Sequence, residues 1–424
     1  MTEINEPLAG LDAIDWAELE HAYGPADDVP GQLRALCVGD ASARGKALND
    51  LYGNIFHQGS RYPASAFVVP FLARMAADVS LPDRDEHLEL LAALAIGYDE
   101  AHLPAGLDIA GWRRELADFR ARDPQEIRAE YDVWVEGATD AGERRVREMR
   151  RAMFDREQQL GAAEAELGAY DAVRREVPAL CVLLGDDDPA VRAATAYLLA
   201  WFPEEAGGTL QQLLEVLDGE TEPVVVATAL VSAGLLGDVG LVERLAPFLT
   251  AGEPVVRWSA ATALARLGAI GAERTFSAVV LAELAAAAAE PPEPAVLFHA
   301  GDLRGYAAAS LSTLADRFPR EALAAVTDGL AATSGPGSFP VAAAALRLAF
   351  GEPQRGVSPE FDELDERQQR LICTLGSLDE KTWRWANFWE IVRAWGLPQQ
   401  REAMRAYARM LPNERGPQPD DPPC

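Results

Sequence analysis

Three copies of one short pattern in the middle of the chain constrain the fold more than any other feature. Each copy has an apolar helical stretch, then a short acidic loop with a glycine, then a proline that opens a second apolar stretch. The prolines are Pro189, Pro223 and Pro254, which are 34 and 31 residues apart. A repeat period of about 20 to 50 residues is typical of stacked supersecondary units. The sequence therefore predicts an array of helix pairs.

The first copy shows why each unit forms two helices. Asp188 can cap the second helix, and Pro189 suits its first turn because an amide there has no helical partner. Val191, Ala194 and Leu198 recur at helical spacing, which places them on one buried face. One pair cannot bury its own apolar face, so successive pairs are expected to stack.

The pattern Asp-Pro-x-Val-Arg with its period of about 30 residues resembles bacterial HEAT-like repeats, including the type named after phycobilin lyases. The resemblance covers about residues 178–268. In such families the arginine of the motif joins a polar ladder between successive repeats, which implies that role for Arg192 and Arg257. The middle copy departs from the pattern, because Val226 stands at this place.

Weaker copies of the pattern and changes in composition divide the rest of the chain. Residues 1–122 are predicted to form degenerate helical repeats, and the central array is predicted over 178–350. Between them, residues 123–177 are densely charged and predict an amphipathic helical insertion. A tryptophan-rich helical cap is expected over 351–412 and a disordered tail over 413–424. The predicted fold is an all-α solenoid of HEAT-like hairpins with this insertion and this cap.

The formal charge of −29 limits the partners that the chain can bind. A strongly acidic surface repels phosphate backbones and anionic lipid, which disfavours nucleic acid and membranes. No apolar run approaches the ~20 residues that a membrane span needs. The four cysteines are widely spaced and no secretory leader is evident, so a cytoplasmic protein is predicted. A composition rich in Ala, Gly and Arg is typical of a GC-rich bacterial genome.

Signals for catalysis and for metal binding are weak. The five histidines show no paired metal-ligand spacing, and the chain has no phosphate loop, dinucleotide fingerprint or nucleophile elbow. Deoxyhypusine hydroxylases are HEAT-repeat enzymes that bind iron through His-Glu dipeptides, and this sequence contains none. We therefore predict no cofactor, no metal and no catalytic residue.

The most suggestive polar cluster follows an apolar stretch near residue 50. Asn54, His57, Gln58 and Arg61 have the spacing of one helix face, provided that the helix continues across the intervening glycine, and Tyr62 follows them. Such a face could contact a partner. The alternative is a capped helix end whose polar side chains bond to the local backbone, and this alternative is favoured.

A second candidate lies in a tryptophan-rich segment over 382–395. Five residues have the spacing of a buried helical stripe: Trp385, Phe388, Trp389, Val392 and Trp395. This spacing favours a core over an interface. Trp383 projects away from the stripe, so we expect it to be exposed and to contact a partner.

The charged insertion contains a third candidate. One side of its predicted helix carries arginines, and another carries apolar residues. The two sets are Arg144, Arg147 and Arg151, and Val146, Met149, Met153 and Leu160. The arginines could hold phosphate or an acidic partner. A solvated face is favoured instead, because Glu143 and Glu148 interleave them and Arg144 with Glu148 is an i, i+4 pair.

Three functions remain open at this point. Stacked helix pairs present an extended concave surface that usually binds protein or peptide, so the favoured hypothesis is a non-catalytic scaffold or adaptor. Some bacterial HEAT-like proteins are DNA glycosylases, but that class needs a basic concave face, which the charge of −29 opposes. The third is an acidic inhibitor or immunity protein that masks a basic partner, and its association would slow as salt rises.

Overall fold

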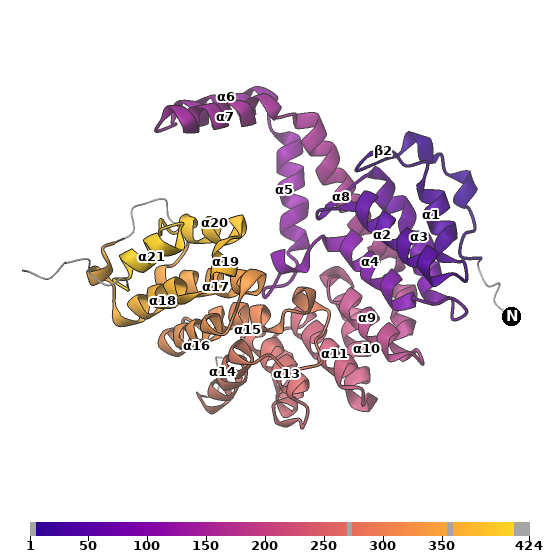
Figure 1. Cartoon of the computed structure of the whole chain (residues 1–424). Helices are drawn as coiled ribbons and strands as arrows, with labels where there is room; N and C mark the ends of the chain where they lie inside the picture. The colour runs from indigo at the N-terminus through magenta and orange to yellow at the C-terminus, as the bar shows by residue number, and fades with distance from the viewer. Residues whose placement is uncertain (1–5, 269–273, 354–358, 411–424) are drawn as a thin grey trace, which may run out of the picture. The chain divides into compact units, whose positions relative to one another are not determined.

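The computed structural model describes residues 6–268, 274–353 and 359–410, and they form an all-α protein (Figure 1). The predicted all-α class is confirmed, whereas the stacking of the pairs into one solenoid stays a prediction. Contacts divide the chain into two compact units. Unit 1 comprises Met1–His102 and Gly106–Glu220, and unit 2 comprises Leu103–Ala105 and Thr221–Cys424. The predicted boundaries of the five segments stay a prediction, and the tail at 413–424 lies outside the described residues.

The described part of unit 1 contains ten α-helices and two short hairpins, besides a few short 3-10 helices. The helices are α1 (Val29–Leu36), α2 (Ala41–Asn54), α3 (Pro63–Ala77), α4 (Arg84–Ile96), α5 (Ile109–Ala121), α6 (Pro124–Glu136), α7 (Ala141–Met153), α8 (Arg156–Leu180), α9 (Pro189–Leu199) and α10 (Ala206–Gly219). Strands β1 (Glu20–His21) and β2 (Gly24–Pro25) pair antiparallel, as do β3 (Phe56–His57) and β4 (Ser60–Arg61). The core of unit 1 lies where α3 and α4 pack against α8.

The described part of unit 2 contains the remaining α-helices and several short 3-10 helices. The α-helices are α11 (Pro223–Leu236), α12 (Val242–Leu245), α13 (Pro254–Arg266), α14 (Arg274–Ala289), α15 (Leu303–Ser312), α16 (Pro319–Ala331), α17 (Ser338–Phe350), α18 (Glu366–Ser377), α19 (Glu380–Trp383), α20 (Ala386–Ala394) and α21 (Arg401–Tyr407). Helices α11 and α13 form the most extensively packed pair. Both helices are buried along nearly their whole length.

The repeat motif starts helices where the sequence predicts them. Helices α9, α11 and α13 begin at the three repeat prolines. The Asp188 carboxylate caps α9 by accepting a 2.9 Å hydrogen bond from the Ala190 amide. Glu222 and Glu253 stand before α11 and α13, but neither makes a side-chain cap. Glutamate is one methylene longer than aspartate and is not among the preferred N-cap residues.

Glu89 on α4 gives a testable electrostatic signature of the core of unit 1. Burial, reinforced by Asp85 and Glu86, raises the pKa of Glu89 from 4.5 to about 7. Because the folded state holds the proton more tightly, stability falls as the pH rises from about 4.5 to about 7. We expect Glu89→Gln to remove this loss, so that the variant gains melting temperature over the wild type at about pH 8 but not at about pH 4.

The neighbouring His87 does not disturb that comparison. Burial lowers the pKa of His87 to about 4, so its contribution has the opposite sign and is lost as the pH falls below 6.5. Both proteins carry His87, so its effect cancels in the difference between their thermal unfolding curves. A difference that did not change with pH would contradict the assignment to Glu89.

Candidate functional site

The possible polar face around residue 57 does not form, because α2 ends at Asn54 and the chain turns into a hairpin. Gln58 and Gly59 occupy the turn between β3 and β4 with φ values of 52° and 86°. Glycine adopts positive φ without the steric cost that other residues meet, which favours this turn over a continued helix. The condition for one shared helix face, a helix that continues across Gly59, is therefore not met.

Most side chains of this cluster bond to their own surroundings. Asn54 is buried, and its amide nitrogen donates to Gln32 at 3.0 Å and to Asp28 at 3.3 Å. His57 Nδ1 lies 3.0 Å from the Gly53 carbonyl and 3.4 Å from the Tyr23 hydroxyl. Gln58 is exposed at the tip of the turn.

Arg61 and Tyr62 connect the hairpin to neighbouring helices. The buried guanidinium of Arg61 lies 3.6 Å from the Glu166 carboxylate and 5.7 Å from the ring centroid of Trp112. Burial lowers the pKa of Arg61, and Glu166 opposes that shift. The Tyr62 amide donates to Ser65 Oγ at 2.8 Å and caps the start of α3. These contacts agree with the capped helix end, the alternative that the sequence favoured.

The tryptophan-rich segment differs from its predicted register. Trp383 was expected to be exposed but is buried, and its Nε1 donates to the Leu375 carbonyl at 3.2 Å. Trp385 was expected in the buried stripe but is 48% exposed. Two short helices, α19 and α20, replace the single helix assumed, so the i, i+3, i+4 spacing does not run across the break. Within α20 the spacing holds for Phe388 and Val392, which are fully buried, whereas Trp389 is half-buried.

The two motif arginines make equivalent contacts within their own units. Arg192 donates to the Asp186 carbonyl at 2.7 Å and to the Glu220 carboxylate at 2.7 Å. Arg257 donates to the Ala251 carbonyl at 2.9 Å and to the Glu283 carboxylate at 3.2 Å. Each arginine thus closes the loop before its own helix and reaches a glutamate farther along the chain. Glu220 directly follows α10, and Glu283 lies within α14. Their part in a ladder along the array stays a prediction.

The charged insertion contains the most distinctive surface of unit 1. Helices α6 and α7 lie side by side beyond the ends of α5 and α8 (Figure 1). They pack on each other, and within the described chain no other element packs extensively on either one. The α6–α7 hairpin buries Ile127 and Val135, but it has no larger core beneath it.

One face of α7 carries large apolar side chains that the described chain leaves largely exposed. Val146 is 45% exposed, Met149 55% and Met153 75%. These three residues, which we call the apolar stripe, share a face because they lie three, four and seven residues apart. Their amphipathic spacing is visible in the sequence, but their exposure is not. Leu160 does not belong to the stripe, because α7 ends at Met153 and Leu160 lies on α8.

The arginines of α7 divide into two sets. Arg147 is buried, donates to the Trp134 carbonyl and pairs with Glu143 at 2.5 Å. Arg151 pairs with Asp132 of α6 at 2.6 Å. Three arginines stay exposed, and no other described residue bonds to their guanidinium groups: Arg144, Arg145 and Arg150. The expected pair of Arg144 with Glu148 is therefore not formed.

Thr139 explains why Glu143 pairs with Arg147. Its amide and its hydroxyl donate to the Glu143 carboxylate at 2.8 Å and 2.7 Å. These bonds and the Arg147 guanidinium lower the pKa of Glu143 to about 2. The carboxylate is thereby fixed at the start of α7, on the side that faces α6.

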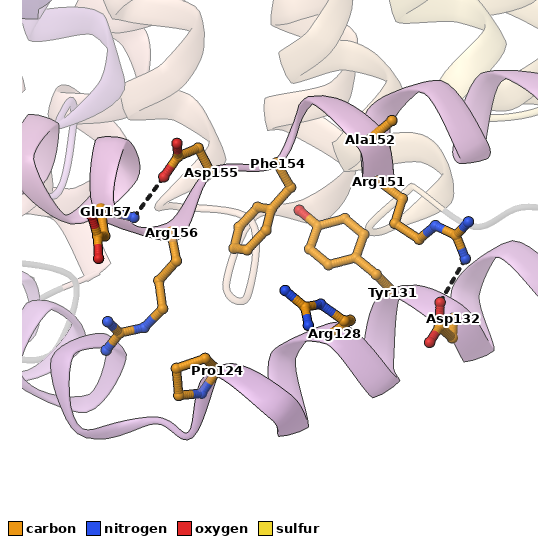
Figure 2. Close-up of a pocket in the computed structure, with 10 residues that line it drawn as sticks. All are labelled: Pro124, Arg128, Tyr131, Asp132, Arg151, Ala152, Phe154, Asp155, Arg156 and Glu157. Carbon is orange, nitrogen blue, oxygen red and sulfur yellow. Dashed lines mark hydrogen bonds and ion pairs between the residues drawn. The ribbon is translucent and has the colours of Figure 1, made fainter.

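A hollow of about 740 Å³ lies at the junction between the end of α7 and the start of α8 (Figure 2). The rings of Tyr131 and Phe154 meet inside it, with their centroids 4.7 Å apart. Two of its arginines are engaged, since Arg151 pairs with Asp132 and Arg156 donates to the Arg120 carbonyl at 2.8 Å. The third arginine that lines the hollow, Arg128, forms no hydrogen bond or ion pair with another described residue.

The hollow lies where the hairpin meets the rest of unit 1, and several of its side chains make local structural bonds. Arg156 satisfies carbonyls at the end of α5, where cations are favourable. Asp155 caps α8 by accepting a 2.9 Å hydrogen bond from the Glu157 amide. In the described ranges, no group of three His, Cys, Asp or Glu side chains could hold a metal ion. No helix of those ranges is long and apolar enough to cross a membrane.

Comparisons with known proteins add no family. No protein-family model matches the chain, and no curated protein matches it. Among solved structures, the chain is similar to an engineered protein whose crystal structure was determined by the Northeast Structural Genomics Consortium. The two share 17% sequence identity over 90% of this chain and 97% of the other, with a TM-score of 0.25. A similarity at this level assigns no function, so the candidate site rests on its own geometry.

Proposed function

We propose that this chain is a non-catalytic protein- or peptide-binding scaffold, and that the α6–α7 hairpin is the element that contacts the partner. The observation that carries the proposal is the apolar stripe of Val146, Met149 and Met153. Contiguous exposed apolar side chains rimmed by polar residues mark interaction sites. Methionine suits such sites because its flexible thioether adapts to different surfaces.

The weak packing of the hairpin supports the same function. Each of its two helices has 13 residues, a length at which an isolated helix is marginal in water. Its caps are local: Asp123 accepts from the Gln125 amide at 2.8 Å, and Asp140 accepts from the Gly142 amide at 2.7 Å. Binding elements are commonly drawn from such regions of low local stability, which gain order from the partner.

The size of the stripe sets what it can contribute. Fully burying one valine or methionine side chain stabilises a complex by about 1.5–3 kcal/mol. These three side chains are already partly covered, and association costs several kcal/mol of lost freedom. The stripe therefore acts as the central apolar contact of a larger interface. The sequence suggested the concave face of a solenoid as the binding surface, and the hairpin is a more specific candidate.

Affinity capture with matched variants tests this function. The baits are the wild type, Met149→Ser/Met153→Ser in the stripe, and the control Val79→Ser/Val182→Ser. Val79 and Val182 are 80% and 72% exposed and also belong to unit 1, so the control removes comparable apolar surface elsewhere. We expect one dominant protein with the wild type and the control, and its loss with the stripe variant. Identical captured proteins with all three baits would contradict the proposal.

A further inference from the structure

We propose that the partner contacts α7 through an acidic amphipathic helix, which lays its apolar face on the stripe and its carboxylates on Arg145 and Arg150. This inference rests on the proposed function and specifies the chemistry of the partner. When one helix docks on another in this way, apolar side chains at helical spacing make the central contact. The charged side chains that flank them select the partner.

The two arginines flank the stripe on opposite sides. Arg150 lies four residues after Val146, and Arg145 lies four residues before Met149. Residues four apart are neighbours on a helix surface, so each arginine borders the stripe along one edge. An apolar strip with a cation on each edge matches a helix whose apolar strip has an anion on each edge.

The guanidinium groups at these edges are available. Arg145 and Arg150 are exposed, and no hydrogen bond or ion pair ties them to another residue of the described chain. The glutamates of α7 do not neutralise them. Glu143 is held by Thr139 and Arg147, and Glu148, three residues after Arg145, forms no ion pair with it in the described chain.

The charge of this helix contrasts with that of the chain. Helix α7 carries five arginines and two glutamates, whereas the whole chain has a formal charge of −29. An acidic segment is repelled by most of the surface and attracted at α7, which directs its docking there. The stripe from Val146 to Met153 spans ~10 Å along the helix axis, so about two turns of a partner helix cover it.

Two other occupants fit the surface less well. A second copy docked with α7 against α7 would bring Arg145 and Arg150 of both copies together, and like charges at an interface are unfavourable. An anionic bilayer would attract α7, but the charge of −29 opposes the approach of the whole protein. The stripe also lacks the tryptophan and phenylalanine residues that anchor interfacial helices.

Binding of three synthetic peptides to the full-length chain tests the chemistry. Each peptide has about 18 residues and the same leucine stripe on a helical template, and the flanking positions are Glu, Gln or Lys. Fluorescence anisotropy should show the Glu peptide binding ~10-fold more tightly than the Gln peptide at low salt, and the Lys peptide most weakly. The advantage of the Glu peptide should shrink as the salt rises from about 0.05 M to about 0.5 M.

Charge reversal on the protein provides the matched variant. Arg145→Glu/Arg150→Glu should invert the order, so that the Lys peptide binds best. Arg320→Glu/Arg393→Glu changes the net charge equally at exposed positions of unit 2 and should leave the order unchanged. All replaced side chains are exposed, and circular dichroism melting curves check that each variant is folded.

Several outcomes would overturn the inference. They are equal binding of the three peptides, no detectable binding of the Glu peptide at ~100 µM, and dimerisation through α7 in sedimentation experiments. Binding to phosphatidylcholine–phosphatidylserine vesicles, with no peptide bound, would overturn it in favour of a membrane. A preference for the Gln peptide that Met149→Ser/Met153→Ser abolishes would overturn the acidic chemistry but leave the proposed function intact. The proposed function itself is tested separately, by the capture experiment with the stripe variant.

Discussion

Asp186→Ala is expected to destabilise unit 1 by about 3–5 kcal/mol, because it leaves the buried charge of Arg84 without its partner. Arg84 Nη2 lies 2.6 Å from Asp186 Oδ2 and Arg84 Nη1 lies 3.1 Å from Oδ1, which makes a bidentate pair between α4 and the loop before α9. Their side chains are only 8% and 9% exposed. Arg84 Nε also donates to the Ala76 carbonyl at 2.8 Å.

Denaturant unfolding followed by circular dichroism measures this loss. The double variant Arg84→Met/Asp186→Leu serves as the control and should lose less than Asp186→Ala, because it leaves no unpaired charge. The Arg84 guanidinium holds the pKa of Asp186 below its usual 3.8. The contribution of the pair is therefore present above about pH 3.8 and is lost as the pH falls below it. Equal stability of Asp186→Ala and the wild type near neutral pH would contradict this role.

Gly234→Ala should destabilise unit 2 by about 1–3 kcal/mol, although alanine is the better helix former. Gly234 is buried in α11 where that helix packs on α13. A methyl group there would lie 2.6 Å from both Cα and Cβ of Ala263. Backbone atoms cannot give way as a flexible side chain would, so the two helices must separate.

The same substitution at Gly161 of α8 is the matched control. A methyl group at Gly161 would meet nothing within 4 Å. Gly161→Ala is therefore expected to stabilise the chain by about 0.5–1 kcal/mol, through its helix propensity and the smaller entropy of the unfolded chain. Thermal unfolding of the two variants should show shifts of opposite sign. A stabilised Gly234→Ala protein would show that α11 and α13 are not in such close contact.

The features that the sequence predicted correctly depend on local chemistry. The repeat prolines start α9, α11 and α13, because proline at the first turn sacrifices no hydrogen bond. Val191 and Leu198 are buried, since helical spacing alone fixes that they share a face. The all-α class follows from the same periodicity extended along the chain.

The features that the sequence missed depend on breaks in the helices and on tertiary cover. Gly59 was the visible signal that α2 does not reach Arg61, and its positive φ turns the chain into a hairpin. Because of the break between α19 and α20, Trp383 is buried and Trp385 is exposed, the reverse of the prediction. An amphipathic pattern predicts that Met149 lies on an apolar face, but it cannot predict whether another element covers that face. Exposure depends on residues far away in the sequence.

Site-specific photo-crosslinking tests the central claim, that this chain binds a partner through the α6–α7 hairpin, most directly. A photoreactive amino acid replaces Met149 in one protein and Val79 in another, and both are irradiated in a lysate of the source organism. Both positions are exposed on unit 1, at 55% and 80%. We predict one discrete adduct, of the same protein in each repetition, from position 149 and none of that protein from position 79. The same adducts from both positions, or none from position 149, would contradict the claim.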